Sequence, residues 1–182
     1  MTTLSKIASK ISYPMKKNKS QVKIIHIGAI SSTSSKENSA IFCQGLEAMC
    51  ELGFQVSVLA EGNEETQKCC FKLLEKYPQN FEVLESVEQN RQDILEKSNA
   101  IIFTEKPAKK DLAEVIAKNI VPILPEGNGL KDFDLKNETG EAFTFREGNI
   151  WSFVSALVRA GENYKFPYDW NTIKSNLKMI VF

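Results

Sequence analysis

The stretch Val22–Ile30, with the sequence VKIIHIGAI, is a nearly continuous run of apolar residues. A strand that helices cover on both faces needs such a run, because its alternating side chains are then buried on both sides. We therefore predict that this stretch is a central strand of a parallel sheet.

The rest of the chain alternates between strand and helix patterns. Further strands are predicted at Gln55–Ala60, Phe81–Leu84, Ala100–Thr104, Val121–Leu124 and Ala142–Phe145. Helices are predicted at residues 37–52, 64–77, 88–97, 109–118, 149–164 and 169–180. This alternation is typical of βαβ units and predicts an α/β fold: a doubly wound, mostly parallel, Rossmann-like sheet with helices on both faces. Ligands of such sheets bind beyond the carboxyl ends of the strands.

Composition fits a single globular domain, since 42% of the 182 residues are hydrophobic and 25% are charged. No apolar run approaches the ~18 residues that a membrane-spanning helix needs, so we expect no membrane span. Residues 37–182 carry 16 basic and 23 acidic groups. A nucleic-acid-binding face needs the opposite balance, so we expect no nucleic-acid partner.

The beginning of the chain differs in charge from the rest. Residues 1–36 contain seven lysines and no acidic residue, and residues 1–20 lack the apolar segment of a signal peptide. We predict a basic flexible tail or linker at residues 1–20 and a Rossmann-like domain at residues 21–182. A cytoplasmic location is expected, and organellar targeting by the Lys- and Ser-rich start is the alternative.

The residues that most often bind metals are few. Cys43, Cys50, Cys69, Cys70 and the single histidine, His26, do not have the spacing of a zinc site. We therefore expect no metal and four reduced thiols. His26 lies inside the first predicted strand, where a packed residue is expected rather than a catalytic base.

Aromatic residues gather near the end of the chain, at Trp151, Phe153, Tyr164, Phe166 and Trp170. Aromatic residues at helical spacings usually belong to the core, so we predict that these pack inside the domain and do not form a carbohydrate platform.

The loops that follow the predicted strands have a recurring order. Lys36 follows the first strand, Gly62 the second, and Glu105-Lys106-Pro107 the fourth, whereas Glu114 lies in the next helix. Gly127-Asn128-Gly129-Leu130 follows the fifth strand. In order and spacing, residues 20–180 resemble the C-terminal, nucleotide-sugar-binding domain of glycogen and starch synthases, which are two-Rossmann (GT-B) glycosyltransferases.

The resemblance implies a site for ADP-glucose or UDP-glucose and no other cofactor. Its candidate binding residues are Lys36, Gly62, Glu105, Lys106, Glu114, Gly127, Asn128, Gly129 and Leu130. Lys36 matches the family's diphosphate-binding lysine, and Glu114 matches the second glutamate of its E-x7-E pattern. Lys106 stands where the first glutamate is expected, and Glu105 lies one position earlier. The lysines near Glu105 also fit a simple solvated basic loop.

The family pattern is incomplete in ways that bear on catalysis. Ala29 stands where the family has a phosphate-binding arginine, and we expect no acceptor-binding domain before the first strand. We therefore assign no catalytic residue and expect a binding or interaction module that is catalytically incompetent alone. The alternatives are one half of a split glycosyltransferase, active only with a partner chain, and a Rossmann-like module for another phosphorylated ligand. The expected partner is an acceptor-domain protein or a second copy of the chain.

Overall fold

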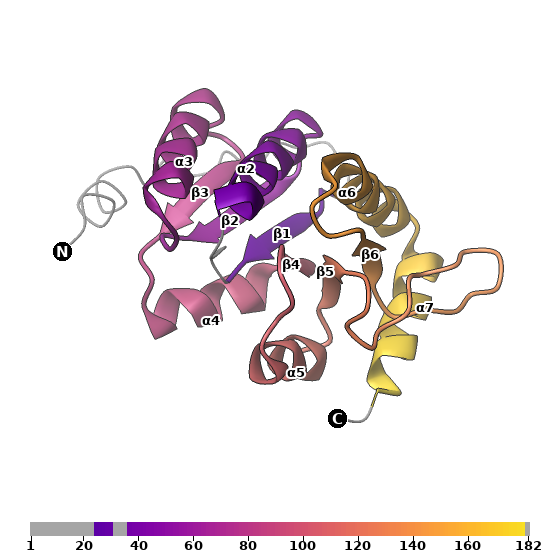
Figure 1. Ribbon diagram of the computed structural model, residues 1–182. Coiled ribbons are helices and arrows are strands. Elements are labelled where there is room, and N and C mark those ends of the chain that lie inside the picture. Colours follow the sequence, from indigo (N-terminus) through magenta and orange to yellow (C-terminus); the bar gives the residue numbers. More distant parts are fainter. Residues whose placement is uncertain (1–23, 31–35, 181–182) are drawn as a thin grey trace.

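The computed structural model describes residues 24–30 and 36–180. Its centre is a six-stranded sheet in the order β3-β2-β1-β4-β5-β6, in which every neighbouring pair is parallel (Figure 1). The strands are β1 (His26–Ala29), β2 (Gln55–Leu59), β3 (Phe81–Leu84), β4 (Ala100–Ile102), β5 (Val121–Pro125) and β6 (Phe143–Phe145). The predicted fold class, a doubly wound α/β sheet, is confirmed.

Helices cover both faces of this sheet (Figure 1). They are α2 (Lys36–Glu51), α3 (Glu64–Lys76), α4 (Glu88–Lys97), α5 (Lys109–Ala117), α6 (Ile150–Lys165) and α7 (Pro167–Lys178). Helices α2, α3 and α6 lie on one face, and α4 and α5 lie on the other (Figure 1). Helix α7 bridges the two, because Trp170 and Ile173 belong to the first core and Leu177 to the second.

Helix α4 approaches strand β1 closely at a glycine. A Cβ atom built on Gly28 would lie 2.5 Å from both Ile94 Cγ2 and Ser98 Oγ. Since real Cβ contacts are longer, this strand position needs glycine for packing and not for a turn.

The aromatic prediction is wrong for two of its five residues. Phe153 and Trp170 are buried and Tyr164 packs against the core, but Trp151 is 81% exposed and Phe166 is 58% exposed. Trp151 precedes the buried Phe153 by two positions, which on a helix is about 200°, so the two face opposite sides. Phe166 lies between α6 and α7, where it caps both helices.

The predicted tail at residues 1–20 lies outside the described residues. Within the described part, no helix is long and apolar enough to span a membrane, and no three metal-binding side chains form a cluster.

Candidate functional site at the carboxyl edge of the sheet

The candidate residues follow strands that all point the same way, so their loops meet at one edge of the sheet (Figure 1). The described loops there are 60–63 after β2, 103–108 after β4 and 126–130 after β5. Residues 31–35, in the loop after β1, lie outside the described residues.

The loop after β4 contacts the beginning of α2. Asn38 Nδ2 donates a hydrogen bond to Glu105 Oε1 at 3.1 Å, which joins residues 67 positions apart. Lys36 is the first residue of α2, and its side chain is not among those described. Glu105 and the start of α2 therefore lie at one place on the sheet edge.

The position of the family's first glutamate is on the surface. Lys106 is exposed, as are Lys109 and Lys110 in the first turn of α5. Ala29, which stands where the family has an arginine, is 1% exposed and belongs to the core. Neither position supplies the charge that the family pattern has there.

Glu114 has protein partners for both of its carboxylate oxygens. Arg91 Nη1 donates to Glu114 Oε2 at 2.5 Å, and Gln92 Nε2 donates to Glu114 Oε1 at 2.9 Å. Arg91 also pairs with Asp111 at 3.0 Å, so these contacts tie α4 to α5. The hydrogen bond from Gln92, together with Arg91, holds the pKa of Glu114 below its usual value of 4.5. A ribose hydroxyl would have to share this carboxylate with Arg91 and Gln92.

The glycines of the edge lie in two turns. Gly62 has a φ of +103°, and its carbonyl accepts a hydrogen bond from Gln67 Nε2 at 3.2 Å. Gly127 and Gly129 have φ values of +80° and +87°, and a Cβ atom on either would meet nothing within 4 Å.

Asn128 and Leu130 hold the second turn. Asn128 Nδ2 donates to the Pro125 carbonyl at 2.5 Å, and Leu130 packs against the core cluster of the α4 and α5 face. This loop is an open glycine turn whose backbone a ligand can approach closely.

Sequence reasoning missed Asn38 and Arg91. Both act across contacts between distant segments, Asn38 with Glu105 and Arg91 with Glu114. No periodicity or motif indicates such pairs. The one signal in the sequence that bears on these contacts is the order of strands and helices, because it predicts which segments lie next to one another in the fold.

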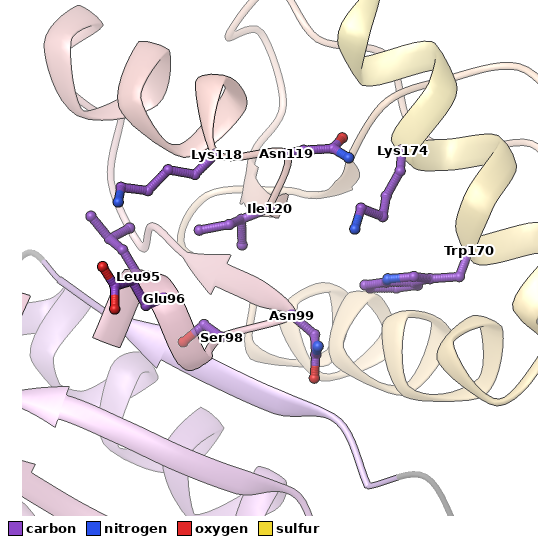
Figure 2. A pocket seen from close by; sticks show the side chains of 9 residues that line it. All are labelled: Leu95, Glu96, Ser98, Asn99, Lys118, Asn119, Ile120, Trp170 and Lys174. Atoms are coloured by element: carbon purple, nitrogen blue, oxygen red, sulfur yellow. The ribbon is translucent and has the colours of Figure 1, made fainter. Parts of the chain in front are cut away.

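A cavity of about 370 Å³ lies at the opposite, amino edge of the sheet (Figure 2). Its lining includes Ser98, Asn99, Lys118, Asn119, Trp170 and Lys174. The segments 98–99 and 118–120 lead from α4 and α5 into the starts of β4 and β5. This cavity contains none of the predicted site residues.

No protein-family model and no curated protein matches the sequence. Among solved structures, the fold is similar to WaaG, a glycosyltransferase involved in lipopolysaccharide biosynthesis, with a TM-score of 0.60 and 9% identity over 99% of this chain and 48% of that one. It is also similar to a sucrose-phosphate synthase from Thermosynechococcus elongatus, with a TM-score of 0.58 and 11% identity over 86% of this chain and 40% of that one. The C-terminal domain of the group 1 glycosyltransferase LpcC from Francisella tularensis has a TM-score of 0.57 and 10% identity, over 94% of this chain and 98% of that one.

These similarities define the class of fold. The chain has the fold of one Rossmann-like half of a GT-B glycosyltransferase, the half that forms the C-terminal domain in such proteins. It spans less than half the length of WaaG and of the sucrose-phosphate synthase.

Proposed function

We propose that this chain is a nucleotide-sugar-binding domain like that of glycogen and starch synthases, which binds its ligand but does not transfer the sugar by itself. The observation that carries the proposal is the Asn38–Glu105 hydrogen bond, since it brings the loop after β4 to the helix that Lys36 begins. The open turn at Gly127–Gly129 follows the neighbouring strand β5 and adds a backbone surface that suits a sugar diphosphate.

The two replaced charges support the non-catalytic part of the proposal. Loss of one positioned electrostatic group typically slows an enzyme by about 10²- to 10³-fold. Lys106 replaces a glutamate of the resembled pattern, and the buried Ala29 replaces an arginine. A site with both changes keeps Lys36 for the phosphate, but it lacks the arginine that would stabilise the departing diphosphate and the glutamate that would contact the donor sugar.

Calorimetric titration with ADP-glucose, UDP-glucose, ADP and UDP tests the binding. We expect dissociation constants between about 10 μM and 1 mM, and about tenfold weaker binding in Lys36→Ala. Lys72→Ala is the matched control, because Lys72 is an exposed lysine on α3, away from the candidate loops. Absence of heat with all four ligands at millimolar concentration would contradict the proposal.

A restoration variant tests the alignment of the loop after β4. Lys106→Glu combined with Lys109→Gly restores two residues of the family pattern at surface positions. We expect tighter binding of the nucleotide sugar and an unchanged affinity for the free diphosphate, because the restored glutamate faces the sugar. Equal affinities for the variant and the wild type would show that these positions do not contact the donor.

The split-enzyme alternative rests on the similarity of this fold to one half of GT-B glycosyltransferases such as WaaG. It predicts glucosyl transfer when this chain is mixed with a partner that supplies the acceptor domain. A pull-down with the purified chain, followed by a transfer assay on the recovered complex with ADP-glucose and UDP-glucose, distinguishes that enzyme half from a non-catalytic module.

A further inference from the structure

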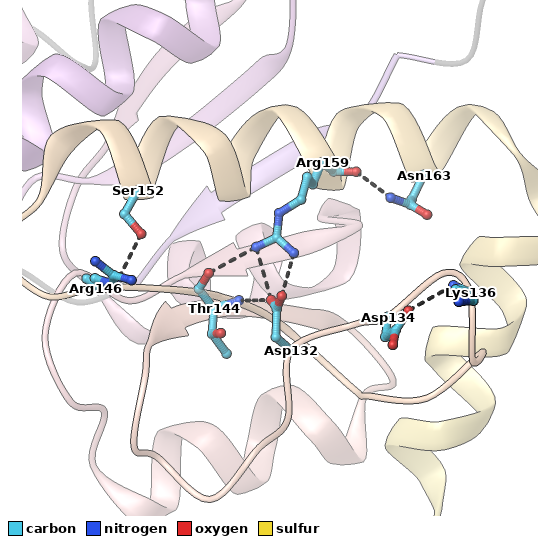
Figure 3. Close-up of polar contacts among 8 residues, drawn as sticks. All are labelled: Asp132, Asp134, Lys136, Thr144, Arg146, Ser152, Arg159 and Asn163. Atoms are coloured by element: carbon cyan, nitrogen blue, oxygen red, sulfur yellow. Dashed lines mark hydrogen bonds and ion pairs between the residues drawn. The ribbon is translucent and has the colours of Figure 1, made fainter.

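A second cavity, of about 390 Å³, lies beside the edge strand β6. All of its lining residues are polar, and they include Glu126, Asp132, Arg146, Ser152, Ser155 and Arg159 (Figure 3 shows four of these six). The volume is within the range of small-molecule sites. The cavity adjoins the loop after β5 through Glu126 but contains none of the candidate nucleotide-sugar residues.

One wall of this cavity is held rigidly. Arg159 binds both carboxylate oxygens of Asp132, at 2.6 and 3.0 Å, and also donates to the Thr144 carbonyl at 3.0 Å (Figure 3). The backbone N–H of Thr144 donates in turn to Asp132 Oδ1 at 2.7 Å. This closed set of bonds fixes α6 to β6 and keeps the wall in place before any ligand arrives.

The other charged groups of the cavity have no such partners. Within the described part of the chain, neither Glu126 nor the guanidinium of Arg146 forms an ion pair. With Asp132 and Arg159, the cavity holds two carboxylates and two guanidinium groups, so its charges balance. A balanced set of donors and acceptors suits a neutral ligand that both donates and accepts hydrogen bonds, and it disfavours a lone anion or cation.

An exposed aromatic ring stands next to this polar surface. Trp151 is 81% exposed on α6 and precedes Ser155 of the cavity by four residues, so the two are neighbours on the helix surface. An indole presents a flat apolar face. A pyranose has the matching form, with hydroxyl groups around its rim and C–H groups on its ring faces.

We propose that this cavity binds a neutral saccharide, with the hydroxyl groups on Glu126, Arg146 and Ser155 and one ring face on Trp151. The proposal goes beyond the nucleotide-sugar site, because it uses a different part of the sheet edge and a ligand without phosphate.

Titration with maltotriose, lactose and N,N′-diacetylchitobiose, followed by calorimetry and by tryptophan fluorescence, tests the proposal. At least one saccharide is expected to bind and to change the emission of Trp151. Trp151→Ala and Arg146→Gln should each weaken that binding about tenfold. Phe166→Ala is the control, since Phe166 is also exposed but does not line the cavity. UDP-glucose affinity should not change in any of the three variants.

Three results would overturn the proposal. The first is no binding of any of the three saccharides at about 50 mM, well above the range of specific sites. The second is binding that both Trp151→Ala and Arg146→Gln retain, because the ligand would then lie elsewhere. The third is preference for glucose 6-phosphate over every neutral saccharide, which would indicate an anion site. Circular dichroism of each variant establishes that it is folded.

Discussion

The Nε2 atom of His26 lies 2.5 Å from the hydroxyl oxygen of Ser57 on the neighbouring strand. Ser57 donates its one hydroxyl hydrogen to Glu82 Oε1, so it accepts from His26 Nε2. Lys97, the last residue of α4, forms an ion pair with the same glutamate, so this chain of polar contacts runs from His26 to α4. His26 is therefore a neutral, packed residue, and its contact with Ser57, which in turn contacts Glu82, links β1, β2 and β3.

This arrangement predicts a pH-dependent stability. Burial, and then the charge of Lys97, lower the pKa of His26 from 6.5 to about 4. The unfolded chain therefore binds a proton at a higher pH than the folded chain. The contribution of neutral His26 to the free energy of unfolding should be fully present above pH 6.5. It should fall as the pH drops towards 4, by at most about 3 kcal/mol. Urea denaturation at several pH values measures this fall.

The control for this experiment is simple, because His26 is the single histidine in the chain. His26→Gln keeps an N–H donor but does not titrate in this range. Its stability should be nearly constant between pH 6.5 and 5, and an unchanged slope would contradict the assignment.

Gly45 in α2 predicts an inverted effect of a helix-favouring substitution. Alanine at an exposed helix position is more stable than glycine by about 1 kcal/mol. A Cβ atom at Gly45, however, would overlap the ring of Phe153, so Gly45→Ala should destabilise the domain by about 1–3 kcal/mol. Gln44→Ala, at the exposed neighbouring position, is the control and should change stability by less than about 0.5 kcal/mol. Chemical denaturation of both variants checks the difference.

The Arg91–Glu114 pair predicts an acid-sensitive link between α4 and α5. Glu114→Gln should cost about 1–2 kcal/mol at pH 7, because Arg91 is 16% exposed and loses one of its carboxylates. The lowered pKa of Glu114 adds stability that is present above pH 4.5 and is lost as the pH falls through the folded pKa. The variant and the wild type should therefore converge at low pH.

Two further measurements define the role of Glu114. Glu162→Gln breaks a surface pair with Lys165 and should cost no more than about 0.5 kcal/mol. If Glu114→Gln instead weakened UDP-glucose binding and left stability unchanged, the glutamate would belong to the ligand site.

The two tryptophans predict opposite responses. Trp170 is 6% exposed and contacts Phe143 and Tyr164 at ring-centroid distances of 6.3 and 5.1 Å. Trp170→Ala should destabilise the domain by about 3–5 kcal/mol, whereas Trp151→Ala should have almost no effect. Acrylamide should quench the wild-type emission in two components, and the accessible component should disappear in Trp151→Ala.

The strands and helices could be predicted because their signals are local. Phe81–Leu84 and Glu88–Lys97 agree residue for residue with β3 and α4, and the other elements differ by a few residues at their ends. The predicted start at Val22 lies outside the described residues, and β1 is described from His26. The last helix begins at Pro167, earlier than predicted, since proline is well tolerated in the first turn of a helix.

The site was less predictable, because its contacts join distant segments. Nothing near Glu114 in the sequence indicates that Arg91 binds it, and nothing near Glu105 indicates Asn38. Exposure of Trp151 depends on which side of α6 meets the sheet, and that is settled by the neighbouring helix α2 through Gly45 and Phe153.

The helices on the two faces of the sheet bury different numbers of their own residues. Helix α4 buries Ile94 and Leu95 alone, whereas α6 on the other face buries five residues. Brief opening of the native state should therefore begin at α4, and the ion pairs of Arg91 should make α5 open with it. In deuterated water, the amide hydrogens of α4 and α5 should exchange together and ahead of those of α6. The layer formed by α4 and α5 would then be less stable than the layer that contains α6.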